Sequence, residues 1–312
     1  MKKIEFKRLK KWENELNICI RCGYCYEQCH LFKQYNWETD TPRGKLLLIY
    51  AMITGVIEPS KYIAEKIFQC FYCKNCSKNC SAKLPITDIF TDARADLIDA
   101  GFDIENSPII EINPGKCRRC LTCVSVCKAG ALSIDTKHRK IIVDRVKCKG
   151  CGVCLALCPA EAITQKDSFE ISRNEIFKKI IESLKKTKII VFCCNWSIYP
   201  EFQLSRIESL QNKKFEIIVT MCAGRIDPRL IIDAFYNGAN GVMVACCPPD
   251  MCENNGNLRI EKKISSLKNL FEQIDINPER LSLEYIATGE VPKFKEIINK
   301  FVDKITLLGP IL

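Results

Sequence analysis

The chain has 312 residues, of which 47% are hydrophobic and 27% charged, and its formal net charge is +10. It is too long for one small domain and is expected to form two or three domains with packed cores. The positive charge alone would suit a nucleic-acid binder, but no RNP, helix-turn-helix or zinc-finger pattern accompanies it, so we expect no nucleic-acid partner.

The first part of the chain is expected to be helical and to lack a membrane segment. Its start is basic and amphipathic, without the apolar core and small-residue cleavage site of a signal peptide. The longest apolar run, 46–57, is too short to span a bilayer and is predicted to be a buried helix. Asp40 or Thr41 would cap this helix, Pro42 suits its first turn and Gly55 would end it. We therefore expect a soluble, cytoplasmic protein.

Cysteine is the most informative residue type in this sequence. The chain has 22 cysteines, a load that disulfides explain poorly in a compartment where thiols are kept reduced. Most of them form two pairs of C-x2-C-x2-C-x3-C motifs, at Cys19, Cys22, Cys25, Cys29; at Cys70, Cys73, Cys76, Cys80; at Cys117, Cys120, Cys123, Cys127; and at Cys148, Cys151, Cys154, Cys158.

This spacing is typical of iron–sulfur ligation, in which three thiolates surround one four-iron cubane and the fourth binds the other cluster of the pair. Oxidised clusters of this kind carry about −2 each, so four of them with one two-iron cluster would bring the protein to roughly neutral. The predicted ligand sets are Cys19, Cys22, Cys25, Cys80; Cys70, Cys73, Cys76, Cys29; Cys117, Cys120, Cys123, Cys158; and Cys148, Cys151, Cys154, Cys127.

Two alternatives to iron stay open at this point. Zinc sites commonly pair two separate C-x2-C knuckles, and disulfides would need an oxidising compartment. Only Cys158 is followed by proline, as the bacterial ferredoxin pattern expects. Cys29, Cys80 and Cys127 are followed by other residues, which loosens the match without removing a ligand.

The segments between the motifs differ in kind and predict two different cluster-binding modules. Residues 30–69 look helical, whereas 128–147 are expected to form a short helix, a turn and a strand. The junction is expected at 105–116, which contains two prolines and a glycine. We therefore predict a helical ferredoxin domain at 1–106 and a two-cluster ferredoxin domain at 107–168, each with two [4Fe–4S] clusters.

After residue 168 the pattern changes to alternating strands and helices, which predicts a parallel, flavodoxin-like sheet in a domain at 185–312. The first three strands all end in cysteine, at the edge where such sheets place their sites. The fold class is thus multidomain, α+β and α/β. The predicted strands are 188–194, 215–222, 241–247 and 281–286, and the helices are 201–211, 228–236, 258–274 and 292–305.

Three parts of the chain resemble known protein families. Residues 117–163, with "CLTCVSVCKAGAL" and "CGVCLALCPAEAI", resemble a bacterial-type two-[4Fe–4S] ferredoxin. Residues 19–101, with "CIRCGYCYEQC", "DTPRGKLLLIYAMITG" and "CFYCKNCSKNC", resemble the helical ferredoxin domain of heterodisulfide reductase and of the glycolate oxidase iron–sulfur subunit. Residues 188–312, with "FCCNW", "MCAGRIDP", "GANGVMVACCPPDMC" and "LLGPIL", resemble the delta subunit of methyl-viologen-reducing hydrogenase.

The last resemblance implies one [2Fe–2S] cluster in addition to the four [4Fe–4S] clusters. The sequence departs from that family at Ser197, where the family has a cysteine, and at Cys246, where it usually has a small residue. Neighbouring residues of a strand point to opposite faces, so Cys193 and Cys194 are not expected to serve equally as ligands of this cluster. The alternative is that the cluster is absent and the thiols are buried small hydrophobes. The candidate ligands, of which four are needed, are Cys193, Cys194, Cys222, Cys247 and Cys252.

The resemblances imply an electron-transfer subunit without a catalytic site of its own. It would relay electrons between a hydrogenase or formate dehydrogenase and the flavoprotein of a heterodisulfide reductase-like complex, where electron bifurcation occurs. A second hypothesis is a reductase acting directly on a disulfide or small organic substrate, but the sequence has no CCG, G-x-G-x-x-G or P-loop motif. A third is an iron–sulfur scaffold or redox sensor without a stable partner.

Overall fold

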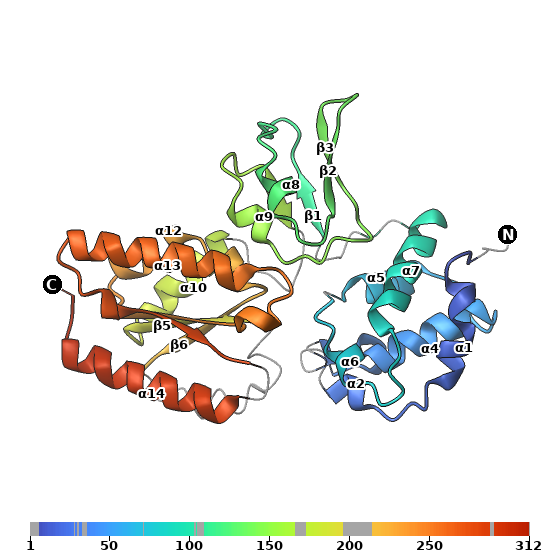
Figure 1. Cartoon of the computed structure of the whole chain (residues 1–312), viewed down its shortest axis with the longest axis horizontal. Coiled ribbons are helices and arrows are strands. Elements are labelled where there is room, and N and C mark those ends of the chain that lie inside the picture. Colours follow the sequence, from blue (N-terminus) through green and yellow to red (C-terminus); the bar gives the residue numbers. More distant parts are fainter. Residues whose placement is uncertain are drawn as a thin grey trace. The chain divides into compact units, whose positions relative to one another are not determined.

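A computed structural model describes residues 6–27, 29, 31–32, 36–70, 72–102, 104, 109–165, 173–195, 214–287 and 290–311. The chain divides into two compact units (Figure 1). The first unit comprises 1–109, 143–150 and 166–168, and the second comprises 110–142, 151–165 and 169–312. The predicted helix at 201–211 and Ser197 lie outside the described residues. The three domain boundaries given above stay a prediction.

Helices make up the first unit. The predicted buried helix is confirmed as α4, and Thr41 rather than Asp40 caps it, because the Thr41 hydroxyl accepts a hydrogen bond from the Gly44 N–H at 2.8 Å. The helical segments are η1 (Leu9–Trp12), α1 (Glu13–Ile18), α2 (Tyr24–Glu27), η2 (Glu38–Asp40), α4 (Pro42–Ile53), α5 (Lys61–Phe68), α6 (Asn75–Lys78) and α7 (Ile86–Asp99).

The core of the first unit forms where these helices meet. Fully buried apolar side chains from η1, α4, α5 and α7 fill it, and their removal from water is the main stabilising contribution. The start of the chain is fixed to α7 by the Asp96 carboxylate, which accepts hydrogen bonds from the backbone N–H groups of Arg8 (2.9 Å) and Leu9 (3.0 Å). The two motifs of this unit are thus carried by short helices around one packed core.

The second unit begins with a small ferredoxin-like part. Strand β1 (Ile110–Ile112) pairs antiparallel with β4 (Ile163–Gln165), and short helices α8 (Thr122–Val126) and α9 (Val153–Ala156) follow the second cysteine of each motif. The short helix expected within 128–147 is wrong. Strands β2 (Leu132–Asp135) and β3 (Lys140–Val143) pair there instead, because the Asp135 carboxylate closes the intervening turn by accepting from the N–H groups of Lys137 and His138.

A four-stranded parallel sheet forms the rest of the second unit. Its strands are β5 (Ile189–Cys194), β6 (Glu216–Thr220), β7 (Gly241–Cys246) and β8 (Leu281–Tyr285), in the order β6-β5-β7-β8. The central strands β5 and β7 are buried along their whole length, as expected for a parallel sheet covered on both faces. The predicted strands and parallel sheet are confirmed, while the flavodoxin-like assignment stays a prediction.

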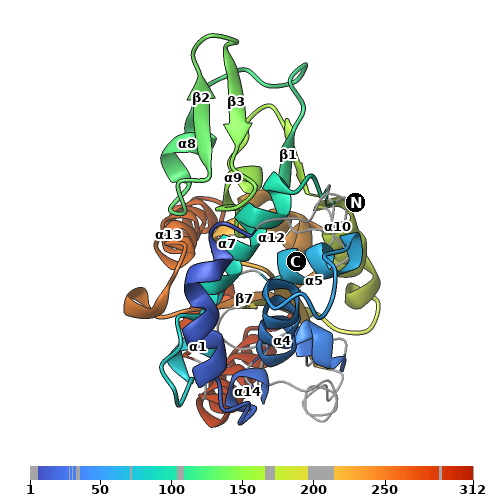
Figure 2. The same cartoon turned by 90° about the vertical axis from the view of Figure 1, so that its right-hand side faces the viewer.

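Helices cover both faces of this sheet. In both views α14 (Val291–Leu308) lies on one side of the sheet, and α12 (Pro228–Tyr236) and α13 (Gly256–Gln273) lie on the other (Figures 1 and 2). Helix α10 (Arg173–Leu184) packs against α12 and β5 and therefore lies on the same side as α12. The α14 face contains an apolar cluster in which Phe294, Ile298 and Phe301 pack with residues of β5 and β7. No helix among the described residues is both long and apolar enough to cross a membrane.

Candidate iron–sulfur sites

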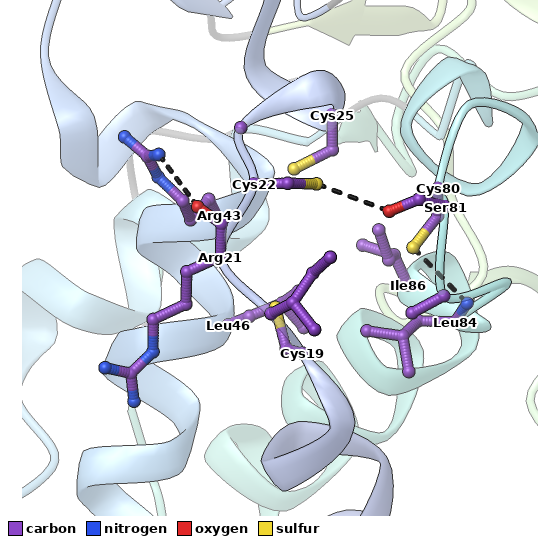
Figure 3. A pocket seen from close by; sticks show the side chains of 13 residues that line it. Cys19, Arg21, Cys22, Cys25, Arg43, Leu46, Cys80, Ser81, Leu84 and Ile86 are labelled. Atoms are coloured by element: carbon purple, nitrogen blue, oxygen red, sulfur yellow. Dashed lines mark hydrogen bonds between the residues drawn. The ribbon is translucent and has the colours of Figure 1, made fainter.

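The four thiols of the first predicted ligand set line one cavity in the first unit. Cys19, Cys22 and Cys25 come from the loop before α2 and from α2 itself, and Cys80 comes from the loop after α6 (Figure 3). The cavity and the open space at its mouth together measure about 340 Å³. Two hydrogen bonds orient its sulfurs, one between Cys22 Sγ and the Ser81 hydroxyl (3.4 Å) and one from the Leu84 N–H to Cys80 Sγ (3.4 Å). Three cysteines of the first motif and the fourth cysteine of the second motif therefore line the same cavity. This is the combination expected if the fourth cysteine of each motif binds the cluster of the other motif.

A matching cavity, of about 360 Å³ when the open space at its mouth is included, lies in the ferredoxin-like part of the second unit. It is lined by the third predicted set, in which Cys158 joins Cys117, Cys120 and Cys123. The Ala162 N–H donates to Cys158 Sγ at 3.3 Å, the same i+4 relation that Leu84 has to Cys80. Two cavities of similar size with the same arrangement of thiols indicate two sites for the same kind of group.

The remaining two sets differ in how far the structure brings them together. In the first unit, burial raises the pKa of Cys73, and the charges of Cys70 and Cys29 raise it further, which places Cys29 beside the second motif. The fourth set is divided, because Cys148 belongs to the first unit and Cys127, Cys151 and Cys154 to the second. Ligation of iron by any of these sets stays a prediction.

The same backbone conformation recurs in all four motifs. The residues directly before and after the second cysteine have positive φ in every copy, although five of these eight residues are not glycine. Left-handed backbone costs a non-glycine residue about 1–2 kcal/mol, and such strain persists where a functional site requires it. Our sequence analysis missed this signature. The residues and their φ angles are Arg21 (55°), Gly23 (90°), Tyr72 (56°), Lys74 (64°), Arg119 (58°), Leu121 (62°), Gly150 (66°) and Gly152 (72°).

Thiol electrostatics favour a cationic group in these cavities. Burial and, after it, the neighbouring charges of Cys19, Cys80 and Cys22 together raise the pKa of Cys25 to about 12. Without a cation the Cys25 thiol would resist ionisation, whereas a metal deprotonates a coordinating thiol outright. Among the described residues, no group of three His, Cys, Asp or Glu side chains is arranged to hold a single metal ion. Four thiols around one cavity fit a cubane, which takes four thiolate ligands.

A buried arginine links two of the motifs within the first unit. Arg94 of α7 is fully buried between the rings of Phe68 and Tyr72, at 4.8 Å and 4.3 Å from their centroids. Its guanidinium donates to the carbonyl oxygens of Phe68 (3.0 Å), Cys148 (3.2 Å) and Cys70. The first cysteines of the second and fourth motifs are thus held by one side chain.

In the second unit, a further group of thiols lies at the carboxyl ends of β5, β6 and β7. The Sγ atoms of Cys194 and Cys247 are 3.7 Å apart. A hydrogen bond with Cys194 raises the pKa of Cys222, and hydrogen bonds with Cys194 and Cys252 raise that of Cys247. Cys194, Cys222, Cys247 and Cys252 therefore form one continuous group, which has the four thiols that a two-iron cluster needs.

The fifth candidate, Cys193, lies elsewhere. It is buried on the α14 face of the sheet, in the same apolar cluster as Met243, Ala245 and Phe294. Because consecutive strand residues alternate between faces, Cys193 and Cys194 are separated by the sheet itself. Cys246, not among the candidates, is fully buried; burial raises its pKa, and the charges of Cys194 and Cys252 raise it further.

Polar groups without partners surround this thiol group. The side-chain oxygens of Asn195 and Thr220 and both polar atoms of the Asn257 amide are buried without a hydrogen bond. Asn257 follows Gly256, whose α-carbon lies so close to Cys222 that an added Cβ would come within 2.3 Å of the sulfur. Buried polar groups in proteins are almost always satisfied. Of these atoms, the Thr220 hydroxyl and the Asn257 Nδ2 can donate, so together with the four thiols they fit a bound group whose sulfurs accept hydrogen bonds.

The ferredoxin-like part contacts this thiol group within the second unit. Arg225, three residues after Cys222, is buried and donates to the Gln165 side chain at 2.5 Å. Its guanidinium lies over Gly152, between Cys151 and Cys154. Lys128 donates to the Cys252 carbonyl (3.3 Å) and the Asn255 side chain (3.1 Å). Contacts between such distant segments are invisible in the sequence, and our sequence analysis missed them.

Comparison with known families agrees with this arrangement. Residues 189–309 match the family described as methyl-viologen-reducing hydrogenase, delta subunit. Residues 15–84 and 116–181 each match a 4Fe-4S dicluster domain. The predicted order of two ferredoxin-type domains followed by a delta-subunit domain is confirmed.

Individual relatives fall into the same groups. The chain is 36% identical over 212 residues (67% of its length) to one of the subunits of the ferredoxin/F(420)H(2)-dependent CoB-CoM heterodisulfide reductase of Methanosarcina acetivorans, but spans only 27% of that relative. It is 33% identical over 83 residues (26% of its length) to a probable glycolate oxidase iron-sulfur subunit of Bacillus subtilis, of which it covers 19%. It is 35% identical over 125 residues (39% of its length) to the vhc iron-sulfur subunit of the F420-non-reducing hydrogenase of Methanococcus voltae, of which it covers 87%. The chain therefore belongs to the family of the methyl-viologen-reducing hydrogenase delta subunit, with two 4Fe-4S dicluster domains preceding the delta-subunit domain in sequence.

Proposed function

We propose that this protein is an electron-transfer subunit that carries four [4Fe–4S] clusters and one [2Fe–2S] cluster. The observation that carries the proposal is the convergence of thiols from paired motifs on two cavities of similar size. When bound, such clusters supply one-electron redox chemistry. The chain supplies the thiolate ligands, the backbone N–H groups that hydrogen-bond to sulfur, and a buried environment, all of which set reduction potentials.

In this proposal the ligands of the four cubanes are the four swapped sets given above. The two-iron cluster is held by Cys194, Cys222, Cys247 and Cys252, and Cys193 is not a ligand. Its exclusion rests on the core position of Cys193, whose neighbours on the α14 face are apolar.

Two buried arginines support a continuous electron path. In the second unit, Arg225 packs on Gly152, and Cys151 is among the charges that raise the pKa of Cys222, after its hydrogen bond with Cys194 and its burial. We infer that the cubane bound by Cys151 exchanges electrons with the two-iron cluster. In the first unit, Arg94 holds the carbonyls of Cys70 and Cys148. We infer that the same cubane also exchanges electrons with the helical domain.

The relatives suggest the setting of this relay. Some are subunits of CoB-CoM heterodisulfide reductases and others are hydrogenase iron-sulfur subunits. We propose that the chain passes electrons between a hydrogenase or formate dehydrogenase and the flavoprotein of a heterodisulfide reductase-like complex that bifurcates electrons. A cytoplasmic location follows from the proposal, since the ligands must stay reduced thiols before they bind iron.

Anaerobic purification from native cells tests both levels of the proposal. Five clusters require about 18 irons per chain and EPR signals in the reduced protein. Co-elution with a flavoprotein and with a hydrogenase or formate dehydrogenase would support the assigned partners. A zinc-loaded or disulfide-linked protein would overturn the electron-transfer function, and an iron-loaded protein without partners would overturn only the assigned complex.

A further inference from the structure

Arg94 of α7 is a fully buried cation without an acidic partner in the described part of the chain. Its guanidinium lies between the rings of Phe68 and Tyr72, at 4.8 Å and 4.3 Å from their centroids. Its hydrogen bonds go to three backbone carbonyl oxygens, those of Phe68, Cys70 and Cys148, and its Nε has no partner. A buried charge destabilises a protein unless an opposite charge accompanies it.

The described groups in contact with this guanidinium supply dipoles rather than a full negative charge. Burial raises the pKa of Tyr72, so its phenol stays neutral, although the charge of Arg94 opposes this shift. Aromatic faces and carbonyl oxygens attract a cation, yet each carries only a partial negative charge. Two of the three carbonyls belong to Cys70 and Cys148, the first cysteines of the second and fourth motifs. The thiolates of these motifs are therefore the candidates for the missing negative charge.

The cubanes proposed for these two motifs would carry that charge. With four thiolate ligands, an oxidised cubane carries about −2, and reduction adds one more negative charge. The first cavity is different, because its lining residue Arg43 already binds both oxygens of Glu38, at 2.7 Å and 3.0 Å. A buried arginine that lacks a carboxylate thus accompanies ligands of two predicted cubanes, whereas this arginine of the first cavity is paired.

We propose that Arg94 is the shared counter-charge of the two cubanes to which Cys70 and Cys148 contribute ligands, and that it raises the reduction potentials of both. This inference rests on the proposed function. Arg94 stabilises the negative charge that one electron from a one-electron donor adds to either cubane. It neither gains nor loses a proton, because a guanidinium stays charged in proteins. Because one side chain serves both cubanes, a change at residue 94 should shift both potentials together.

Two replacements of Arg94 in the full chain test the inference by anaerobic EPR redox titration. Arg94→Gln removes the charge but keeps an N–H donor for the carbonyls, whereas Arg94→Lys keeps the charge and loses the planar guanidinium. In Arg94→Gln we expect two cubanes to become at least tenfold harder to reduce, a shift of about 59 mV in each midpoint potential. In Arg94→Lys the two midpoints should stay much closer to those of the wild-type protein.

Arg280→Gln is the matched control for the loss of a buried arginine. Arg280 is only 7% exposed and also donates to backbone carbonyls, among them those of Asn240, Leu308 and Gly309, none of which belongs to a cysteine motif. This variant should leave every midpoint unchanged. A Cys73→Ser background identifies one of the affected cubanes, because the ligand set of the second motif is then incomplete and one of the two shifts should disappear.

The contrast between Arg94→Gln and Arg94→Lys separates a role of the charge from a purely structural role. Unshifted midpoints in Arg94→Gln at wild-type iron content would overturn the inference, as would equal shifts in both Arg94 variants or the same shifts in Arg280→Gln. A shift of one cubane alone, or two shifts that persist in the Cys73→Ser background, would contradict the shared role. If Arg94→Gln loses the irons of both cubanes, retention of iron in Arg94→Lys would support the role of the charge, and loss from both variants would refute it. Absence of iron or EPR signal from the wild-type protein would instead refute the proposed function.

Discussion

Gly152 offers a quantitative test of the contact between the ferredoxin-like part and the delta-subunit domain. Its φ is +72°, a conformation that costs an alanine about 1–2 kcal/mol. A Cβ at this position would lie 2.4 Å from Nη1 and 2.7 Å from Cδ of Arg225. Because Arg225 is buried, its side chain has to shift, and it would lose its hydrogen bond to Gln165, worth about 1.5–3 kcal/mol for a charged group.

We therefore expect Gly152→Ala to destabilise this region by about 2.5–5 kcal/mol in total. Gly130→Ala is the matched control, since Gly130 has a similar φ of +62° but no atom within 4 Å of an added Cβ. The control should cost only the backbone contribution, about 1–2 kcal/mol. The difference between the two variants isolates the contact with Arg225.

Native-state hydrogen exchange is the suitable assay, because a protein of several domains does not unfold in one two-state transition. In Gly152→Ala, amide protection in 151–165 should fall about a hundredfold to a few thousandfold, against roughly tenfold in 127–135 for Gly130→Ala. In an Arg225→Ala background, Gly152→Ala should cost no more than the control. Equal losses from the two glycine variants in the otherwise unchanged protein would refute the reasoning.

Three further predictions concern the thiols directly. Cys120→Ser should remove about four irons and leave the delta-subunit domain folded by circular dichroism; loss of every EPR signal together would contradict the modular arrangement. Gly256→Ala should displace the Cys222 sulfur and remove about two irons; unchanged iron content would exclude Cys222 as a ligand. In the iron-free chain, the hydrogen bond from Cys247 lowers the pKa of Cys252 below that of an ordinary cysteine. Cys252 should therefore alkylate at lower pH than an ordinary cysteine, and Cys247→Ala should shift the pH dependence of its alkylation to higher pH. An unchanged pH dependence would refute the role of the Cys247 hydrogen bond.

Local sequence patterns were enough to predict the strands of the four-stranded parallel sheet and most of its helices. The strands at 188–194 and 241–247 are uninterrupted apolar runs ending in cysteine, and the structure has β5 and β7 there. The turn and the second strand expected within 128–147 are present, but the segment expected as a helix is β2, because its pairing with β3 decides its conformation. The left-handed residues such as Arg119 and Leu121 also gave no local signal, because their side chains do not favour that conformation.

The sequence by itself determined how many thiols are available, their spacing, and which family they resemble, because ligand chemistry and motif spacing are properties of short stretches. Only the tertiary structure decided that Cys194 rather than Cys193 joins Cys222 and Cys247, since that choice depends on which face of β5 meets the ends of β6 and β7. The tertiary structure likewise buried Arg94 between the rings of Phe68 and Tyr72 and placed Arg225 over Gly152. Burial and charge balance arise from segments far apart in the chain, so no short stretch of sequence encodes them.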